Sequence, residues 1–130
     1  MLPSDFLPSS ACTNNGDLKQ VKYGNNDYVD YTYDDYGNIS AISQNGTKNF
    51  TWQYDSTGNL YSHKDLVNNQ RFVYTYDSTG RLIRQNVYES GQKSVYSSEY
   101  GYDLNNNVSK FTSSAGGVSV TENFEYGKDN

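Results

Sequence analysis

Three residues that lie close together in the sequence have the side-chain types of a hydrolytic triad. They are Ser62, His63 and Asp65, and His63 is the only histidine in the chain. Neighbouring residues on a β-strand point to opposite faces of the sheet. On a strand, Ser62 and His63 would therefore not form the hydrogen bond that links a nucleophile to its base. We expect a plain surface histidine here, and no catalytic residue.

Aspartates recur along the chain and could be considered as metal ligands or as paired carboxylates for glycoside hydrolysis. They are Asp34, Asp55, Asp77 and Asp103. Calcium takes about six to eight oxygen ligands, whereas each of these segments supplies mostly one carboxylate. An aspartate that opens a tight turn instead accepts hydrogen bonds from backbone N–H groups two residues on. The pattern favours Asp-capped turns, with no metal ion and no cofactor.

The composition argues against several other classes of function. The net charge is −5 and the sequence has no run of Lys or Arg, so a nucleic-acid partner or an anionic membrane surface is disfavoured. Cys12 is the only cysteine, which excludes an internal disulfide. No segment approaches the ~20 apolar residues of a membrane-spanning helix, and residues 1–10 lack the basic and apolar regions of a signal peptide.

One phrase of residues is repeated along the chain, with the pattern aromatic-x-Tyr-Asp-x-x-Gly-(Asn/Arg)-aliphatic. Complete copies lie at residues 31–39, 52–60, 74–82 and 100–108, and partial copies lie near 12–18 and 124–130. We therefore divide the chain into a non-repeat tail, residues 1–11, and a block of repeats, residues 12–130. Since the last copy stops within the phrase, we expect a piece of a longer array.

Before each aspartate, aromatic residues alternate with polar ones, which is the pattern of a β-strand. The repeated aromatic pairs on one predicted face are Tyr31 and Tyr33, Trp52 and Tyr54, Tyr74 and Tyr76, and Tyr100 and Tyr102. Aromatic rings on adjacent strands interact favourably and bury a large area each. We expect these rings to form ladders that hold the sheet together.

The segment after each aromatic pair predicts a type I turn followed by a G1 bulge. Its fourth position needs a residue that adopts positive φ, and it is occupied by Gly37, Gly58, Gly80 and Asn106. Other turn signals, such as Asn45-Gly46, separate the copies. The alternation predicts an all-β fold: an antiparallel meander of about ten strands, built from tandem hairpins and curled into a strip or partial shell.

These copies of the phrase resemble the YD-repeat, or RHS-repeat, family, and the resemblance covers residue 14 to the C-terminus. It implies a long β-strip that spirals into a hollow shell. Such shells enclose a toxic polypeptide in bacterial toxins and belong to an adhesion ectodomain in teneurin-like surface proteins. The chain has no Asp-Pro-x-Gly core segment and no self-cleavage site of that family, so autoproteolysis and toxicity are not transferred to it.

Two hypotheses follow. The first is a non-enzymatic structural segment of a bacterial secreted or cell-surface protein, whose partners are neighbouring repeats. Its sheet edges would self-associate unless residues 1–11 cover one of them. The second is a carbohydrate-binding or adhesion module with a glycan or protein ligand. Its contacts would come from the tyrosines outside the repeated pairs, which are Tyr28, Tyr36, Tyr61 and Tyr88.

Overall fold

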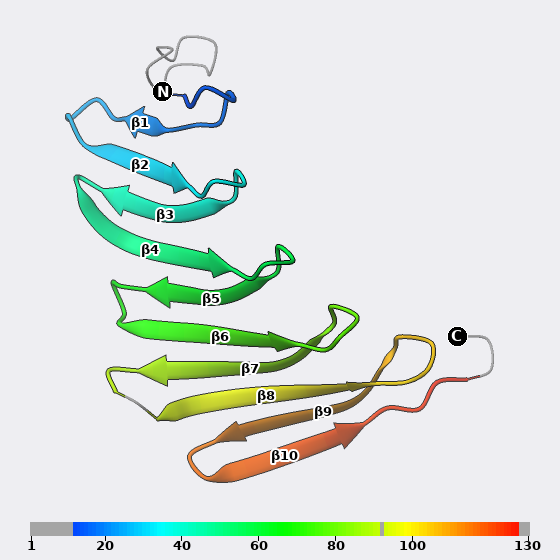
Figure 1. Cartoon of the computed structure of the whole chain (residues 1–130). Coiled ribbons are helices and arrows are strands. Elements are labelled where there is room, and N and C mark those ends of the chain that lie inside the picture. Colours follow the sequence, from blue (N-terminus) through cyan, green and yellow to red (C-terminus); the bar gives the residue numbers. More distant parts are fainter. Residues whose placement is uncertain (1–11, 92, 128–130) are drawn as a thin grey trace.

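The computed structural model describes residues 12–91 and 93–127, and the predicted tail, residues 1–11, lies outside them. In the described residues, ten strands form one antiparallel sheet in sequence order, without a helix (Figure 1). The strands are β1 (Gln20–Lys22), β2 (Tyr28–Tyr33), β3 (Ile39–Gln44), β4 (Thr47–Tyr54), β5 (Leu60–Asp65), β6 (Gln70–Tyr76), β7 (Leu82–Glu89), β8 (Ser94–Tyr102), β9 (Val108–Ala115) and β10 (Val118–Asn123). The predicted all-β meander of about ten strands is confirmed.

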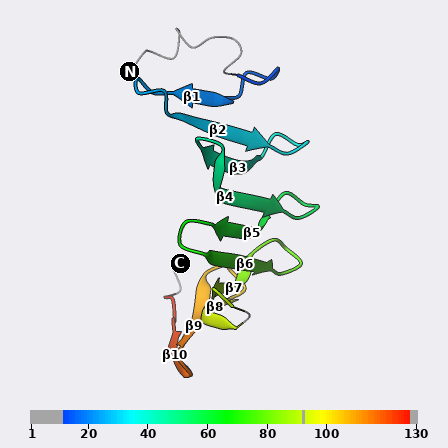
Figure 2. The same cartoon turned by 90° about the vertical axis from the view of Figure 1, so that its left-hand side faces the viewer.

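The sheet is an open strip, because β1 and β10 lie at its two ends and do not pair with each other. All the Asp turns lie along one long edge of the strip, on the right in Figure 1, and the other connections lie along the opposite edge. The strip twists strongly between its ends, so that β8 to β10 are turned relative to the first strands (Figure 2). Each strand pairs only with the strands next to it in the sequence, as in a repeat protein.

One face of the strip, which we call the aromatic face, carries most of the rings. Its central row runs across five strands through the register pairs Trp52↔His63, His63↔Phe72, Phe72↔Val87 and Val87↔Tyr96. The other face, the polar face, carries rows of hydroxyl, amide and charged side chains such as Thr51↔Lys64↔Arg71. Aromatic and polar residues alternate along the strands, so the two kinds of side chain lie on opposite faces of the sheet, as expected.

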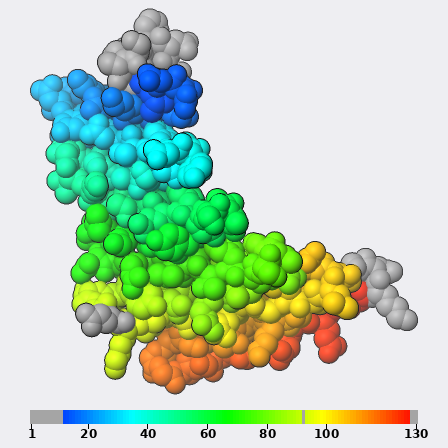
Figure 3. Space-filling view, in the orientation of Figure 1, coloured from blue at the N-terminus to red at the C-terminus, as the bar shows by residue number. Residues whose placement is uncertain are grey.

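The core is thin, because the described residues form a single sheet without a second layer. Among the described residues the buried ones are Ala41, Val87, Ser62 and Ser98, and most aromatic side chains are half-buried. The space-filling view shows a body that widens from the first strands to the last ones (Figure 3). Stability must therefore come from many contacts between neighbouring strands and from the turns.

The Asp turns all share one geometry, illustrated by the first complete copy. The Gly37 N–H donates to the Asp34 carbonyl at 3.1 Å, and the Asp34 N–H donates to the Asn38 carbonyl at 2.8 Å. Gly37 has φ 85° and the register shifts by one residue beside the turn. This is the predicted type I turn with a G1 bulge, in which the fourth residue must adopt positive φ. Asn106 takes that position in the last complete copy, with φ 66°.

Candidate functional site

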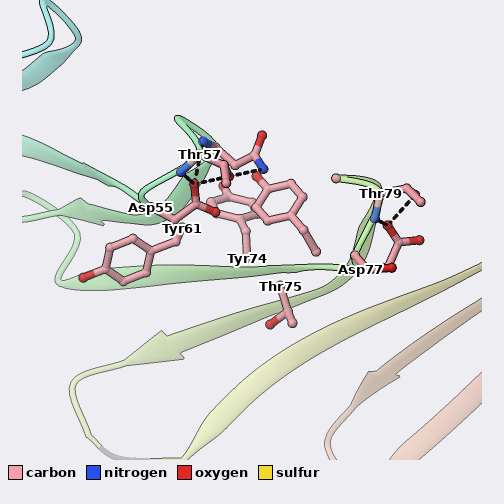
Figure 4. A pocket seen from close by; sticks show the side chains of 11 residues that line it. Asp55, Thr57, Tyr61, Tyr74, Thr75, Asp77 and Thr79 are labelled. Carbon is pink, nitrogen blue, oxygen red and sulfur yellow. Dashed lines mark hydrogen bonds between the residues drawn. The ribbon is translucent and has the colours of Figure 1, made fainter.

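The strands pair closely within each hairpin and separate between hairpins at the edge that carries the Asp turns. Between β5 and β6, for example, the ladder ends at the pair Ser62↔Val73. Leu60 and Tyr61 on β5 therefore diverge from residues 74–76 on β6 and leave a wedge. A groove of about 640 Å³ occupies this wedge (Figure 4). The residues that line it are Asp55, Thr57, Asn59, Tyr61, Tyr74, Thr75, Tyr76, Asp77, Ser78, Thr79 and Gly80.

A tyrosine hydroxyl bridges this wedge. The Tyr76 hydroxyl donates to the Leu60 carbonyl oxygen at 2.6 Å. The second tyrosine of the other phrases makes the same bond to the aliphatic residue that closed the preceding phrase. The pairs are Tyr33–Leu18 at 2.7 Å, Tyr54–Ile39 at 2.9 Å, Tyr102–Leu82 at 2.5 Å and Tyr126–Val108 at 2.7 Å. Each hairpin is thus tied to the previous one by one repeated bond, which we call the tyrosine lock.

Three of the tyrosines that form the lock have a raised pKa. Burial raises the pKa of Tyr33, Tyr54 and Tyr76 above the ordinary value, and a nearby aspartate carboxylate adds to each rise. For Tyr76 that aspartate is Asp55 of the preceding turn. A raised pKa keeps the hydroxyl protonated and able to donate to the carbonyl. Sequence reasoning predicted the rings but missed the hydroxyls, because the acceptor lies about one repeat earlier.

The two turns beside the groove hold their aspartates through several donors. The Oδ1 atom of Asp55 accepts hydrogen bonds from the Thr57 N–H at 2.9 Å, the Thr57 hydroxyl at 2.7 Å and the Asn59 N–H at 2.9 Å. The Thr57 hydroxyl and the Asn59 N–H hold the pKa of Asp55 below its usual value. Asp77 accepts equivalent bonds from Thr79, and Arg81 binds its Oδ2 atom at 2.7 Å.

The Asn or Arg that follows the turn glycine has a role that the sequence did not reveal. The Arg81 N–H contributes most to a pKa of Asp77 far below the ordinary value, followed by the Thr79 hydroxyl. In two other copies the Asn side chain donates to the second oxygen of the same aspartate, Asn38 to Asp34 at 3.3 Å and Asn107 to Asp103 at 3.2 Å. In the remaining complete copy the Asn59 side chain donates to the Thr57 hydroxyl at 3.1 Å. The residue after the turn glycine therefore has a side chain that donates a hydrogen bond within the turn.

The structure does not assemble a triad from Ser62, His63 and Asp65. Ser62 is buried on the polar face, opposite Gln53 and Val73. His63 lies on the aromatic face, with its ring stacked 5.1 Å from Trp52 and 5.4 Å from Phe72. His63 is half-exposed on this face, and the register places it in the ring row, which the sequence did not predict. Its Nδ1 atom lies 3.2 Å from the Thr51 carbonyl oxygen.

Tyrosines outside the repeated pairs differ in exposure. Tyr36 is 91% exposed at the tip of a turn, and Tyr61 is 41% exposed at the groove. Tyr28 is half-buried next to the Asn45-Gly46 turn, where its N–H donates to the Asn45 side chain at 2.9 Å. Tyr88 is also half-buried, because the Arg71 guanidinium lies 4.3 Å above its ring. Tyr36 and Tyr61 are therefore more exposed than Tyr28 and Tyr88, and a ligand contact at any of the four stays a prediction.

The remaining residues of the phrase lie in the ladders or in the turns. The Tyr100 ring packs 5.2 Å from Phe111, and Arg81 lies 4.6 Å above the ring of Tyr102. In the part of the chain that the structure describes, no group of His, Cys, Asp or Glu is arranged to hold a metal ion. None of the described segments is a helix long and apolar enough to cross a membrane.

Comparison with known proteins gives matches in structure alone. No protein-family model and no curated protein matches the sequence. Among solved structures, the chain is similar to the crystal structure of TcdB2-TccC3, with a TM-score of 0.68 and 20% identity over 78% of this chain and 5% of that chain. The Photorhabdus luminescens Tc holotoxin pore with a mutated TccC3 gives a TM-score of 0.67 at the same identity and coverage.

A third similar structure is TcdB2-TccC3 without its hypervariable C-terminal region, with a TM-score of 0.67 and 20% identity over 86% of this chain and 7% of that one. The chain thus spans a small fraction of the length of the proteins that it matches. The likeness concerns the strip of hairpins, and it supports the resemblance drawn from the repeated phrase. The chain has the fold of a segment of the TcdB2-TccC3 structures, and its resemblance to YD/RHS-repeat proteins is confirmed at the level of the fold.

Proposed function

We propose that the chain is a non-enzymatic structural segment of a bacterial secreted or cell-surface protein of the YD/RHS-repeat kind, and that it forms part of a β-shell. The observation that carries this proposal is the tyrosine lock. The same hydroxyl-to-carbonyl bond joins each hairpin to the preceding one, from Tyr33 to Tyr126. A joint that is the same at every step lets a sheet extend by addition of hairpins.

The similarity to TcdB2-TccC3 supports a structural role within a larger body. The chain corresponds to 5 to 7% of the matched chains, so its partners in this proposal are neighbouring repeats. The role of the phrase aspartates supports the same conclusion. Their carboxylates accept the turn N–H groups in all complete copies, which is a structural use of these side chains.

The last strand offers a direct test, because its outer edge has no neighbour among the described residues. All of β10 is exposed, and Val118 is 66% exposed. An edge of this kind presents unpaired backbone groups that pair with another chain. We therefore expect the chain to self-associate through β10, in the way a further hairpin would pair in the shell.

The experiment is light scattering on a size-exclusion column, over a range of concentrations. The expected result is an oligomer that Val118→Lys shifts towards the monomer, since lysine on an edge strand opposes pairing. Val67→Lys is the matched control, because Val67 is also 66% exposed but lies in the turn between β5 and β6. A chain that stays monomeric at every concentration, or equal effects of the two substitutions, would contradict the proposal.

A further inference from the structure

We propose that the groove between β5 and β6 binds the guanidinium group of an arginine side chain that another polypeptide supplies. The site is separate from the role in a shell, and the two proposals fail in different experiments. The equivalent wedge between β7 and β8 already holds an arginine of this chain, Arg81, and shows how such a group is bound.

Arg81 fills its own wedge through three contacts. Its Nε atom donates to the Oδ2 atom of Asp77 at 2.7 Å, and its Nη1 atom donates to the Asn106 side chain at 3.0 Å. Its guanidinium lies 4.6 Å above the ring of Tyr102. A carboxylate beside an aromatic face is a combination that binds a planar guanidinium well, because one supplies charge-assisted hydrogen bonds and the other a surface for stacking.

The groove between β5 and β6 has the same parts without the arginine. The corresponding residues of the two wedges are Asp55 and Asp77, Asn59 and Arg81, Tyr76 and Tyr102, and Gly80 and Asn106. The first member of each pair lines the groove. Gly80 has open space around its Cβ position, and the Asn59 side chain is shorter than that of arginine. The space that Arg81 fills in its own wedge therefore stays open here.

Asp55 presents a carboxylate oxygen that is free for a ligand. All hydrogen bonds to its side chain from the described residues end on the Oδ1 atom, whereas the Oδ2 atom accepts a bond in each of the other complete copies. The Asn59 side chain lowers the pKa of Asp55 least and donates to Thr57 instead. No buried side-chain polar atom of the described residues lacks a partner, so the Oδ2 atom of Asp55 is reached by solvent.

The charge of the groove favours one cation. Its acidic lining residues are Asp55 and Asp77, and no Lys or Arg lines it. Because Asp77 is already paired with Arg81 at 2.7 Å, Asp55 is the carboxylate left to attract a cation. The Tyr76 ring favours a flat guanidinium over the strongly hydrated ammonium group of lysine. A calcium ion is disfavoured, since it needs about six to eight oxygen ligands.

The ligand is an arginine within a polypeptide, because a free amino acid carries an α-carboxylate. No cationic lining residue would receive that carboxylate, and Asp55 would repel it. The groove has a volume of about 640 Å³, which leaves room for the neutral backbone on either side of an arginine. In Figure 4, Asp55 and Thr57 lie on one side of the groove, and Asp77 and Thr79 lie on the other.

The experiment is saturation-transfer difference NMR on the whole chain, which reads the ligand and tolerates self-association of the protein. The probe is Nα-acetyl-L-arginine N-methylamide at millimolar concentrations. We expect saturation transfer to this probe, and weaker transfer to the matching lysine derivative and to free L-arginine. Asn59→Arg should abolish the transfer, because the new side chain would occupy the groove as Arg81 occupies its wedge. Asp55→Asn keeps the Oδ1 acceptor of the turn, removes the charge and should also lose the binding.

The matched control is Asn38→Arg, which adds the same charge at the equivalent position of the preceding turn and should leave binding unchanged. Both arginine variants introduce the residue that the fold carries at Arg81, so both are compatible with folding, and circular dichroism checks this. Absence of transfer to the arginine derivative, or equal or stronger transfer to the lysine derivative or to free arginine, would overturn the proposal. So would equal losses in Asn59→Arg and Asn38→Arg, since binding would then follow net charge and not the groove.

Discussion

Replacing Tyr76 by Phe removes one hydroxyl and keeps the ring, so it tests the tyrosine lock with little change in packing. The hydroxyl donates to the Leu60 carbonyl across the wedge between β5 and β6, at 2.6 Å. Without it, the two hairpins remain joined at the other end of their strands, through the four register pairs from Ser62↔Val73 to Asp65↔Gln70. The substitution should therefore weaken the joint without abolishing the fold.

The expected magnitude follows from the net value of one hydrogen bond. A typical intramolecular hydrogen bond stabilises a protein by about 0.5–1.5 kcal/mol. With a urea m-value of about 1–3 kcal/mol/M, a loss of about 1 kcal/mol lowers the urea midpoint by roughly 0.3–1 M. Tyr54→Phe and Tyr102→Phe remove the same bond at other joints, and their effects should add when the two are combined, because these residues share no partner.

The assay is equilibrium urea unfolding followed by circular dichroism. Tyr74→Phe is the control, since Tyr74 belongs to the same phrase but forms no hydroxyl hydrogen bond among the described residues, and its midpoint should change by less than that of Tyr76→Phe. Both rings are half-buried, so the two substitutions are made at positions of similar exposure. Equal midpoints for Tyr76→Phe and the unsubstituted chain, or a larger loss for Tyr74→Phe, would refute the reasoning.

Three further predictions concern the turns and the ring row. Hydrogen bonds lower the folded pKa of the phrase aspartates, so their contribution to stability is present above about pH 4 and lost as the pH falls below it. Urea midpoints from about pH 5 to pH 2 should fall, and a flat profile would contradict this. Gly58→Ala should cost about 1 kcal/mol because φ is +88° there with open space around the Cβ position, whereas Gly24→Ala should cost little. Equal urea midpoints for these two variants would contradict the turn assignment. His63→Ala should destabilise the row by about 0.5–1.5 kcal/mol for each stacked ring pair that it removes, while His63→Phe should not. A midpoint for His63→Ala that equals that of the unsubstituted chain would show that the stack is not stabilising.

The strands and turns could be predicted from the sequence because both depend on local chemistry. Alternation of period two marks the strands, and the Asp and Gly of the phrase fix the turn within five residues, as in residues 34–38. Even the exception at Asn106 follows from local rules, since Asn tolerates positive φ better than other non-glycine residues.

The contacts that the sequence did not reveal join residues that are far apart in the sequence and are brought together by the pairing of strands. The Tyr76 hydroxyl meets a carbonyl 16 residues earlier, and no local pattern predicts that distance. The stacking of His63 could not be predicted from its sequence neighbours alone. Its place between Trp52 and Phe72 arises from the pairing of β5 with β4 and β6. Tyr88 is covered by Arg71 for the same reason, since the two are register partners on adjacent strands.

The groove was also beyond sequence reasoning, although Tyr61 was singled out. The wedge exists because the β5 and β6 ladder stops at Ser62↔Val73, and strand length at the end of a ladder is a tertiary property. Tyr61 stood out because it lies outside the repeated aromatic pairs, which is a signal of sequence alone. The structure adds that it lies beside Asp55 and Tyr74 in one groove.

The most direct test of the account is the internal duplication of residues 55–76, inserted after Tyr76. The unit ends where the next Asp turn begins, so the duplicated chain keeps every phrase, turn and tyrosine lock in phase. If the protein is an open strip with the same joint at every step, the longer chain should fold with two more strands and have an unchanged or higher urea midpoint. A duplicated chain that loses its cooperative unfolding transition would contradict the account.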